Sequence, residues 1–558
     1  MPNIASRLVD IARRFPDTIA IAEPDGKGDY RTITFAELDR DTDKIAAALT
    51  ASGVQPGMKL ALFVRYGIDF ISLVFALCKA HVTLILIDPG MGIRRMLDCL
   101  AEVEPDGFVA VPAVHAVRIL MRHRFPKAKH HLTVGRRWFW GGLTLDEIRR
   151  SNAQSYDCGS VQNENHLAAI IFTSGSTGPP KGVAFTHDMF DTQAHEIAER
   201  FNIQPGEIDL ACFPFFGLFD ATMGVTAVIP DMNPSKPAQA DPAKIVRAAK
   251  RWKITQSFAS PALWNRVADY CAKTGERIDT LRRAISAGAP VSAKILAKVK
   301  PCIHPEGEIF TPYGATEALP TAVISATEVL NETAAQTEQG KGVCVGKKFP
   351  SITWKVIAIT DSPLQWNEIQ ELPPIKRAGD YVAGIGELLV TGRQVTKEYV
   401  NRPEANAAAK IKDNEGRIWH RMGDVGYLDE QDRFWFCGRK AHRVITAERT
   451  YFSIPCEAIF NRHPKVYRSA LADSLIDGRR QTADGSRRGG LPRMFIEPLP
   501  EHFPKNEAER KQLLKELREL GQSSPLTESI TEFRLLHSFP VDVRHNVKIN
   551  RELLATYP

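Results

Sequence analysis

The sequence predicts an α/β protein with more than one domain, and three observations support this. Short apolar runs alternate with helical patterns through most of the chain, which is typical of largely parallel strands joined by helices. The length of 558 residues exceeds what one hydrophobic core usually serves. The pattern changes near residues 434–440, and shorter segments follow.

The expected elements can be taken in chain order. Residues 1–15 indicate an amphipathic helix rather than a secretory signal. A strand at 60–64, a helix at 69–80 and a strand at 82–87 form the first β-α-β unit. Later come strands at 167–172 and 183–185, a helix at 188–201, and a strand over 284–290 that ends in a tight turn before a helix at 291–299. Near the end we expect a solvated basic loop at 477–492, with a docking surface as the alternative. A helix at 506–520 carries a leucine stripe that we expect to pack in a local core rather than to bind a partner.

Composition favours an ordinary globular protein of the cytoplasm. Hydrophobic residues make up 44% and charged residues 25% of the chain, and the net charge of +7 is small for this length, so we expect no nucleic-acid partner. The nine cysteines include no Cys-x-x-Cys pair, which predicts reduced thiols. The most apolar window, residues 60–78, is interrupted by Arg65 and Asp69, so we expect no transmembrane segment.

The most informative segment is the loop at 173–182, between two strand-like runs. Its glycines allow close backbone approach, and its hydroxyls and single lysine suit the oxygens of a polyphosphate. It is not a Walker A loop, because Lys181 follows Pro180 and precedes Gly182. A flexible hairpin is the alternative. The residues of this loop predicted to bind a polyphosphate are Thr173, Ser174, Gly175, Ser176, Thr177, Gly178 and Lys181.

This loop is followed, in order, by Tyr-Gly-Ala-Thr-Glu at 313–317, Gly-Asp-Val-Gly-Tyr at 423–427 and a basic segment at 543–551. The series resembles the signature of the adenylate-forming superfamily, which includes acyl-CoA ligases, peptide-synthetase adenylation domains and luciferases. The resemblance implies a large N-terminal domain of mostly parallel sheets flanked by helices (1–438), a hinge (439–441) and a small mobile α+β domain (442–558) that carries Lys548.

The resemblance also implies roles for individual residues in binding ATP and Mg²⁺. Tyr313 would stack on the adenine, Gly314 would also bind ATP, and the segment Gly288, Ala289 and Pro290 would line the adenine pocket. Thr316 would approach the α-phosphate and Glu317 would coordinate Mg²⁺, a role that suits a carboxylate. Asp424 would accept both ribose hydroxyls, and Arg439 would contact the ribose. Lys548 would neutralise the reacting carboxylate and α-phosphate, so with Lys181, Thr316 and Glu317 it forms the predicted catalytic set.

Two departures bear on which member of the superfamily this is. Residues 441–450 contain no glycine, although CoA ligases use a glycine-rich segment there to line the pantetheine channel. Gly217 stands where CoA ligases often carry histidine. Phe215, Phe216 and Phe219 suit an acyl pocket, with core packing as the alternative. The segments 216–220, 229–232, 87–92 and 544–546, with Lys548, resemble the β-lactone synthetases of olefin biosynthesis.

That resemblance implies ATP-dependent adenylation of a long-chain β-hydroxy fatty acid, then closure to a β-lactone with release of AMP. The sequence identifies no general base for the closing hydroxyl; His187 and His442 are candidates, with a solvated or packed histidine as the favoured alternative for each. One alternative is a fatty acyl-CoA ligase, for which CoA would be a further substrate. Another is an inactive nucleotide-binding scaffold, which would not need Lys181, Glu317, Asp424 and Lys548 together. The expected partners are a small lipid substrate and enzymes of the same lipid pathway.

Overall fold

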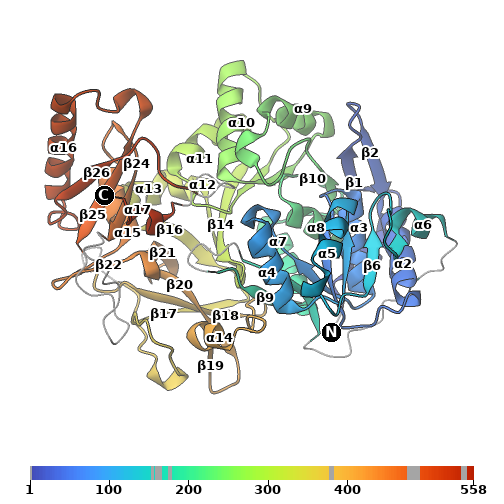
Figure 1. Cartoon of the computed structure of the whole chain (residues 1–558). Coiled ribbons are helices and arrows are strands. Elements are labelled where there is room, and N and C mark those ends of the chain that lie inside the picture. The colour runs from blue at the N-terminus through green and yellow to red at the C-terminus, as the bar shows by residue number, and fades with distance from the viewer. Residues whose placement is uncertain are drawn as a thin grey trace.

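A computed structural model describes residues 3–151, 156, 166–173, 179–375, 382–473, 491–541 and 549–557. Its elements form two sheets with flanking helices over the first 439 residues, and a smaller group of strands and helices after them (Figure 1). Within the described residues, no helix is both long and apolar enough to cross a bilayer.

The smaller sheet lies in the N-terminal part of the chain. Its strands are parallel except for the last, so their carboxyl ends share one edge. In spatial order they are β7 (Leu143–Thr144), β6 (His130–Thr133), β5 (Gly107–Ala110), β3 (Lys59–Phe63), β4 (Thr83–Leu86), β8 (Leu167–Phe172) and β9 (Gly182–Thr186). The helices between them are α3 (Ile68–Lys79), α4 (Ile93–Val103), α5 (Pro112–Leu120) and α6 (Leu145–Arg150).

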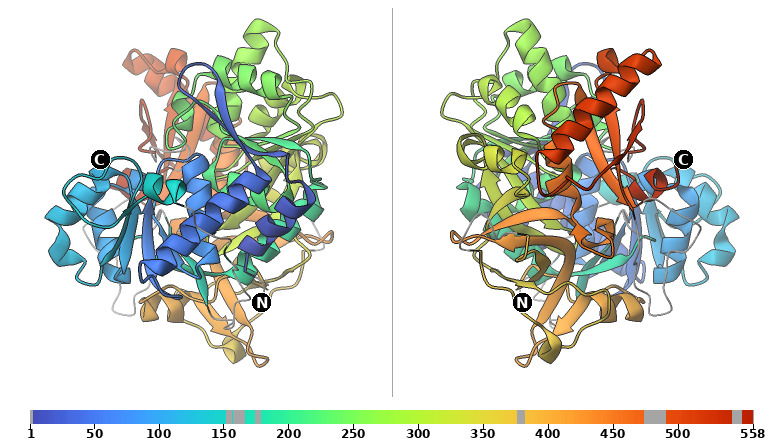
Figure 2. Two further views of the ribbon diagram at one scale, coloured as in Figure 1. Left: turned by 90° about the vertical axis from the view of Figure 1, so that its right-hand side faces the viewer. Right: turned by 90° about the vertical axis from the view of Figure 1, so that its left-hand side faces the viewer.

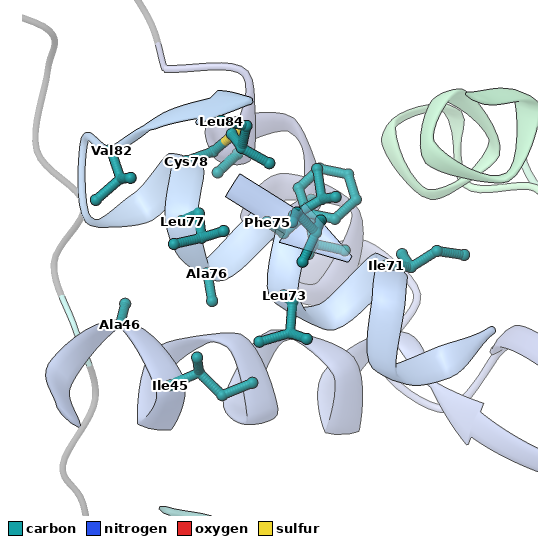
Figure 3. Close-up of a cluster of buried hydrophobic side chains, with 14 of the residues drawn as sticks. Ile45, Ala46, Ile71, Leu73, Phe75, Ala76, Leu77, Cys78, Val82 and Leu84 are labelled. Carbon is teal, nitrogen blue, oxygen red and sulfur yellow. The ribbon is translucent and has the colours of Figure 1, made fainter. Parts of the chain in front are cut away.

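Packing of α2 (Phe35–Ala51) against α3 forms the centre of the first core. α2 begins at a capping box in which Thr34 and Glu37 satisfy each other's backbone N–H groups. Its apolar face, with Ile45 and Ala46, lies against α3 residues that include Leu73 and Leu77 (Figure 3). α3 also buries Lys79, whose ammonium forms ion pairs with Asp39 at 2.6 Å and Asp43 at 2.5 Å.

The larger sheet is mixed, with parallel strands in one half and antiparallel strands in the other. The strands of the parallel half are β11 (Thr226–Val228), β10 (Ile208–Ala211), β12 (Gln256–Ala259), β13 (Arg283–Ser286) and β14 (Glu308–Ala315), with β1 (Ile19–Pro24) alongside β11 and β2 (Tyr30–Thr34) at the edge, antiparallel to β1. The antiparallel half continues through β15 (Ala318–Ser325), β16 (Val343–Lys348), β21 (Arg433–Arg439), β20 (Ile418–Leu428), β18 (Gly386–Gly392) and β17 (Ile352–Ile357), with β19 (Lys410–Lys412) beside β20.

Helices of this part lie between or beside those strands. They are α1 (Ala5–Arg14), α7 (His187–Phe201), α8 (Pro214–Met223), α9 (Pro242–Trp252), α10 (Pro261–Thr274), α11 (Ala293–Val299), α12 (Ala326–Glu328), α13 (Ala334–Glu338) and α14 (Pro403–Ala409). Proline at the start of α8, α9, α10 and α14 suits the first helical turn, where its missing N–H is not needed.

After β21 the chain builds a separate sheet. It contains β24 (Val466–Asp473), β25 (Pro492–Pro498) and β26 (Glu532–Leu535), packed with α15 (Ser453–Phe460), α16 (Glu507–Gln522) and α17 (Arg551–Leu554). A short hairpin, β22 (Val444–Ile445) and β23 (Thr450–Tyr451), follows residue 439. The division at 439–441 and the mobility of the later part remain predictions.

The predicted elements agree well with the observed ones. The first β-α-β unit, the two strands around residues 173–182 and the helix of residues 187–201 lie within a few residues of their expected positions. On α16, Leu513 and Leu517 are buried in the local core, as predicted. The β13 strand ends at Ser286, and Gly288 takes a left-handed φ of 91° in the turn that follows. Eight cysteines lie in the described residues, all buried and unpaired. Most of the basic loop lies outside those residues.

Candidate active site

The predicted phosphate loop begins at the carboxyl end of β8 and returns along β9. Its base is closed by two hydrogen bonds, from the Thr173 N–H to the Lys181 carbonyl (3.1 Å) and from the Lys181 N–H to the Thr173 Oγ1 (3.3 Å). Ser174, Gly175, Ser176, Thr177 and Gly178 lie outside the described residues. The described base of the loop therefore presents Lys181 beside the strand that leads back into the sheet.

Glu317 lies in the turn between β14 and β15, and one side chain joins it to Lys181. The hydroxyl of Tyr399 donates a hydrogen bond to Glu317 Oε1 at 2.7 Å. The ammonium of Lys181 lies 4.8 Å from the centre of the Tyr399 ring, within the range of a cation–π contact. Two predicted site residues from distant parts of the sequence thus meet at an aromatic residue that sequence reasoning missed.

The segment of residues 395–400, which carries Tyr399, is hydrogen-bonded on both sides. It forms bridges to Ala318 at the start of β15 and to Val183 on β9. The Val400 N–H donates to the Gly182 carbonyl (2.8 Å), and the Thr396 N–H donates to the Glu317 carbonyl (2.8 Å). The segment therefore holds the strand behind the phosphate loop and the turn that carries Glu317 at a fixed separation.

Lys410 completes this neighbourhood and was also missed. Its ammonium donates to the Thr396 carbonyl (2.5 Å) and Thr396 Oγ1 (3.0 Å), and lies 5.4 Å from the centre of the Tyr399 ring. Burial lowers the pKa of Lys410 to about 7, an effect that Glu317 opposes and Lys181 reinforces. A lysine at the start of a short strand gave no signal in the sequence, because its importance comes from its burial.

Asp424 and Arg439 face each other across β20 and β21. Arg439 Nη1 donates to Asp424 Oδ1 at 2.7 Å and to the Met422 carbonyl at 3.0 Å. The Tyr313 hydroxyl donates to the other oxygen, Asp424 Oδ2, at 2.5 Å. The Asp424 carboxylate raises the pKa of Arg439. Burial, reinforced by the same carboxylate, raises the pKa of Tyr313 well above its usual value.

These contacts bear on the predicted roles in nucleotide binding. Both Asp424 oxygens already accept one hydrogen bond each, and each has a further lone pair for a ribose hydroxyl. The Tyr313 ring lies near Phe434 and Phe436, with centroids 6.1 and 6.3 Å apart. The turn at Gly288, Ala289 and Pro290 follows β13, the strand next to the one that carries Tyr313 and Gly314. The predicted adenine residues therefore come from the ends of two neighbouring strands, and Tyr313 joins them to the predicted ribose residue Asp424 through its hydrogen bond.

The predicted acyl-pocket residues lie on α8. The ring of Phe216 stacks on Phe258 at a centroid distance of 3.8 Å, and Phe219 meets Phe216 edge-on at 6.1 Å. Phe215 lies 5.8 Å from Phe213. The cluster around Phe216 also contacts Tyr313 and Ala315. Phe216 and Phe219 therefore belong to the same hydrophobic cluster as Tyr313, and the part of the three phenylalanines in binding an acyl chain remains a prediction.

Gly217 has a definite packing reason to be glycine. A Cβ at this position would lie 2.3 Å from the hydroxyl oxygen of Tyr66. Tyr66 thus occupies the space into which a side chain at position 217 would point. The histidine that CoA ligases often carry there would not fit beside Tyr66.

The two candidate histidines, His187 and His442, lie in different parts of the structure. His187 begins α7, at the opposite end of β9 from Lys181, and packs with His81 and His166. Five residues of strand separate it from the loop by about 16 Å, and burial lowers its pKa to about 3. His187 is therefore a packed histidine, the alternative favoured from the sequence, and the strand places it away from the phosphate loop. His442 lies in the turn after Arg439, and Lys548 lies outside the described residues.

Comparisons with known proteins agree with this arrangement. A family model described as AMP-binding enzyme matches residues 8–400. The whole chain is 40% identical to an olefin β-lactone synthetase of Xanthomonas campestris pv. campestris, covering 97% of it. It is 38% identical to another of that name from Stenotrophomonas maltophilia, covering 98%.

Solved structures show the same fold at lower identity. An amide bond synthetase from Marinactinospora thermotolerans has a TM-score of 0.76 and 18% identity, with 99% of each chain covered. An o-succinylbenzoate coenzyme A synthetase from Bacillus subtilis, in complex with AMP, has a TM-score of 0.73 and 20% identity, with 100% of this chain and 98% of that chain covered. The chain belongs to the adenylate-forming family of AMP-binding enzymes, as an AMP-forming, acid-activating ligase similar along its whole length to olefin β-lactone synthetases.

Proposed function

We propose that this enzyme uses ATP to activate a long-chain β-hydroxy fatty acid and then closes it to a β-lactone. The observation that carries the proposal is the 40% identity to an olefin β-lactone synthetase across the full chain. The meeting of Lys181, Tyr399 and Glu317 beside the Asp424–Arg439 pair supports adenylation as the first step.

In the first step the substrate carboxylate attacks the α-phosphorus of ATP, and pyrophosphate leaves. Lys181 would attract the phosphate oxygens as a point charge, and Thr316, in the turn beside Glu317, would approach the α-phosphate. Asp424 and Arg439 would hold the ribose, with Tyr313 against the adenine. Lys548 would stabilise the charge that develops between carboxylate and phosphate.

The residues present fit a magnesium ion. Glu317 Oε1 accepts from Tyr399, which leaves Oε2 for a hard cation, and Mg²⁺ in such sites commonly takes one or two carboxylates plus phosphate oxygens. When bound, Mg²⁺ would neutralise part of the phosphate charge. Tyr399 and Thr396 orient Glu317 through its carboxylate and its carbonyl.

In the second step the β-hydroxyl oxygen attacks the activated carbonyl carbon, AMP leaves with the acyl C–O bond electrons, and the hydroxyl proton passes to a base. Holding both groups in one molecule gives effective molarities of up to about 10⁵–10⁸ M in favourable cases, and strain in the four-membered ring offsets part of this advantage. The apolar α8 cluster would exclude water, which would otherwise hydrolyse the adenylate.

The decisive experiment supplies MgATP and a long-chain 2-alkyl-3-hydroxy acid, with and without CoA, and identifies the organic product. We expect a β-lactone, AMP and pyrophosphate without CoA. A thioester formed only with CoA would show an acyl-CoA ligase instead. Tight nucleotide binding without pyrophosphate release would indicate the inactive scaffold.

A further inference from the structure

Two exposed segments lie on the same edge of the smaller sheet. Residues 92–95 are the N-cap and first turn of α4, after β4 and η1 (Pro89–Met91), and residues 135–139 form the loop after β6; every one of these residues is exposed. Because β4, β3, β5 and β6 run parallel, both segments lie at the carboxyl edge. Thr173, where the predicted phosphate loop begins, follows β8 at that same edge. We call residues 92–95 and 135–139 the arginine–aromatic rim.

The rim exposes large apolar side chains next to pairs of arginines. Ile93 is 58% exposed, Trp138 54% and Phe139 78%. Arg94 and Arg95 follow Ile93, and Arg136 and Arg137 precede Trp138. Side chains of this size usually bury much of their surface, and their grouping with basic residues on one edge indicates a contact surface.

The exposed aromatic residues are held in place by a buried one. Trp140 donates from Nε1 to Thr133 Oγ1 at 2.9 Å and packs on His115 of α5, with centroids 5.5 Å apart. The rings of Trp138 and Phe139 each lie 5.3 Å from the Trp140 ring. The loop therefore has a fixed base in the core, and its two outer rings face solvent from that base.

The chain segment that contains residues 135–139 is basic. Residues 107–145 contain no aspartate or glutamate and seven lysines and arginines: Arg118, Arg122, Arg124, Lys127, Lys129, Arg136 and Arg137. Arg136 and Arg137 lie in the rim itself, whereas the basic residues of the connection between α5 and β6 lie at the amino edge of the sheet.

Acids from outside the segment neutralise only part of this charge. They pair with Arg124 (Asp98), Lys127 (Glu104) and Arg137 (Glu147). In the parts of the chain that the structure describes, Arg94, Arg95 and Arg136 form no ion pair.

We propose that the arginine–aromatic rim binds the surface of a bilayer that carries anionic lipid headgroups. Aromatic rings suit the boundary between headgroups and acyl chains, and arginines beside them attract anionic lipids. The rim is also close to the predicted phosphate loop. β6, which precedes residues 135–139, lies four strands from β8, about 19 Å at the usual strand spacing. The rim would therefore bring the enzyme to a source of its acid substrate, a reason that rests on the proposed function.

The outward position of this region is visible in the whole molecule. The light-blue part of the chain, which includes β5 and α5, stands at an outer side of the molecule in both views of Figure 2.

Vesicle binding tests the proposal without any turnover. The full-length enzyme is sedimented with vesicles of phosphatidylcholine alone or mixed with phosphatidylglycerol. We expect binding to the mixed vesicles that falls with added salt. Trp138→Ala/Phe139→Ala should weaken it by ~10-fold or more, and Arg94→Ala/Arg95→Ala/Arg136→Ala should weaken it and reduce its salt dependence. Leu120→Ala is the matched control, because Leu120 is 76% exposed at the far end of α5, and it should bind like the parent.

The outcomes separate this proposal from the proposed function. Absence of binding to phosphatidylglycerol vesicles by the parent enzyme, or parent-like binding by both rim variants, overturns the rim proposal. Loss of association with another pathway enzyme in the rim variants, with vesicle binding intact, would assign the rim to a protein partner instead. Pyrophosphate release with the long-chain 2-alkyl-3-hydroxy acid, supplied without vesicles, should be unchanged in every variant. If the parent enzyme released no pyrophosphate, that result would count against the proposed function. The vesicle experiment would still test the rim proposal, because it does not depend on turnover.

Discussion

At the scale of single residues, Tyr399 joins the two predicted parts of the phosphate site. Its hydroxyl bonds to Glu317 and its ring faces Lys181. Burial raises the pKa of Tyr399, and Glu317 adds to that effect, so the hydroxyl stays protonated and can donate. The neutral Tyr399 side chain therefore orients the Glu317 carboxylate and contacts the Lys181 ammonium without neutralising either charge.

Replacing Tyr399 with phenylalanine tests this arrangement. A hydrogen bond to a charged group contributes about 1.5–3 kcal/mol, so Tyr399→Phe should slow pyrophosphate release by ~10-fold or more and raise the magnesium concentration needed for half-maximal rate. Tyr270→Phe is the matched control, because its hydroxyl also donates to a glutamate, Glu276, at 2.7 Å. Equal rates for the two variants would remove Tyr399 from the site.

At the scale of elements, the position of α8 depends on a close approach to the segment after β3. The contact between Gly217 and the Tyr66 hydroxyl leaves no room for a Cβ. Since Phe216 and Phe219 lie on the same helix, the contact between Gly217 and Tyr66 also fixes the positions of these two phenylalanines. The absence of a side chain at position 217 is therefore a packing requirement of this chain.

A pair of substitutions tests that requirement. Alanine normally stabilises a helix relative to glycine, but here Gly217→Ala should lower the free energy of unfolding by about 1–3 kcal/mol through overpacking. Tyr66→Phe in the same chain should restore much of the loss, because the next nearest atom, Tyr66 Cζ, is 3.3 Å from the added Cβ. Urea unfolding of both variants, with Tyr66→Phe alone as control, measures the effect. Additive losses would contradict the contact.

Another feature at this scale is the histidine group where β8 begins and β9 ends. Burial lowers the pKa of His187 to about 3, with smaller contributions from His166 and His81, and lowers that of His166. A buried histidine with a lowered pKa is neutral in the folded state while its unfolded form binds a proton. Between pH 6.5 and 3 the unfolded state therefore binds more protons, so stability falls as the pH falls.

Acid unfolding measures this contribution. At pH 5 the charge on unfolded His187 should lower the free energy of unfolding by about 2 kcal/mol relative to pH 7. His187→Gln should show a correspondingly smaller decrease between these two pH values, whatever its stability at pH 7. His123→Gln, at an exposed position, is the control. An unchanged decrease in His187→Gln would contradict the lowered pKa.

At the scale of the whole molecule, ion pairs join the residues just after β21 to β18 and to the loop that follows β17. Lys440 donates to Glu387 at 3.0 Å and Arg443 to Asp361 at 2.6 Å. Burial lowers the pKa of Lys440, and the Glu387 carboxylate opposes this effect. These ion pairs would hold the later part of the chain in the observed position. A rotation about residues 439–441 that moved Lys440 and Arg443 away from the large sheet would have to break them.

The predicted role of Lys548 belongs to this scale, because a separate domain would bring it to the site. Lys548→Ala should slow pyrophosphate release by ~100-fold or more if the ammonium stabilises charge in the transition state. Lys515→Ala, an exposed lysine on α16, is the control. Near-parent release by Lys548→Ala would remove the assignment, while nucleotide binding by the same variant should persist.

Local patterns were sufficient for much of the fold. The strands of residues 167–172 and 182–186, the helices α3, α7 and α16 and the turn at Gly288 follow from apolar periodicity and glycine placement over short windows. The antiparallel half of the large sheet was harder to foresee, because strand pairing there joins segments such as β16 and β21 that lie far apart in sequence.

By itself, the sequence determined the family, the order of its motifs and the residue types that suit phosphate and a hard cation, since these depend on local composition and spacing. Only the tertiary structure decided that Tyr399 and Lys410 belong beside Glu317, that Tyr66 fills the space at Gly217 and that His187 lies away from the phosphate loop. Each of these depends on burial and on contacts between distant segments, which no local pattern encodes.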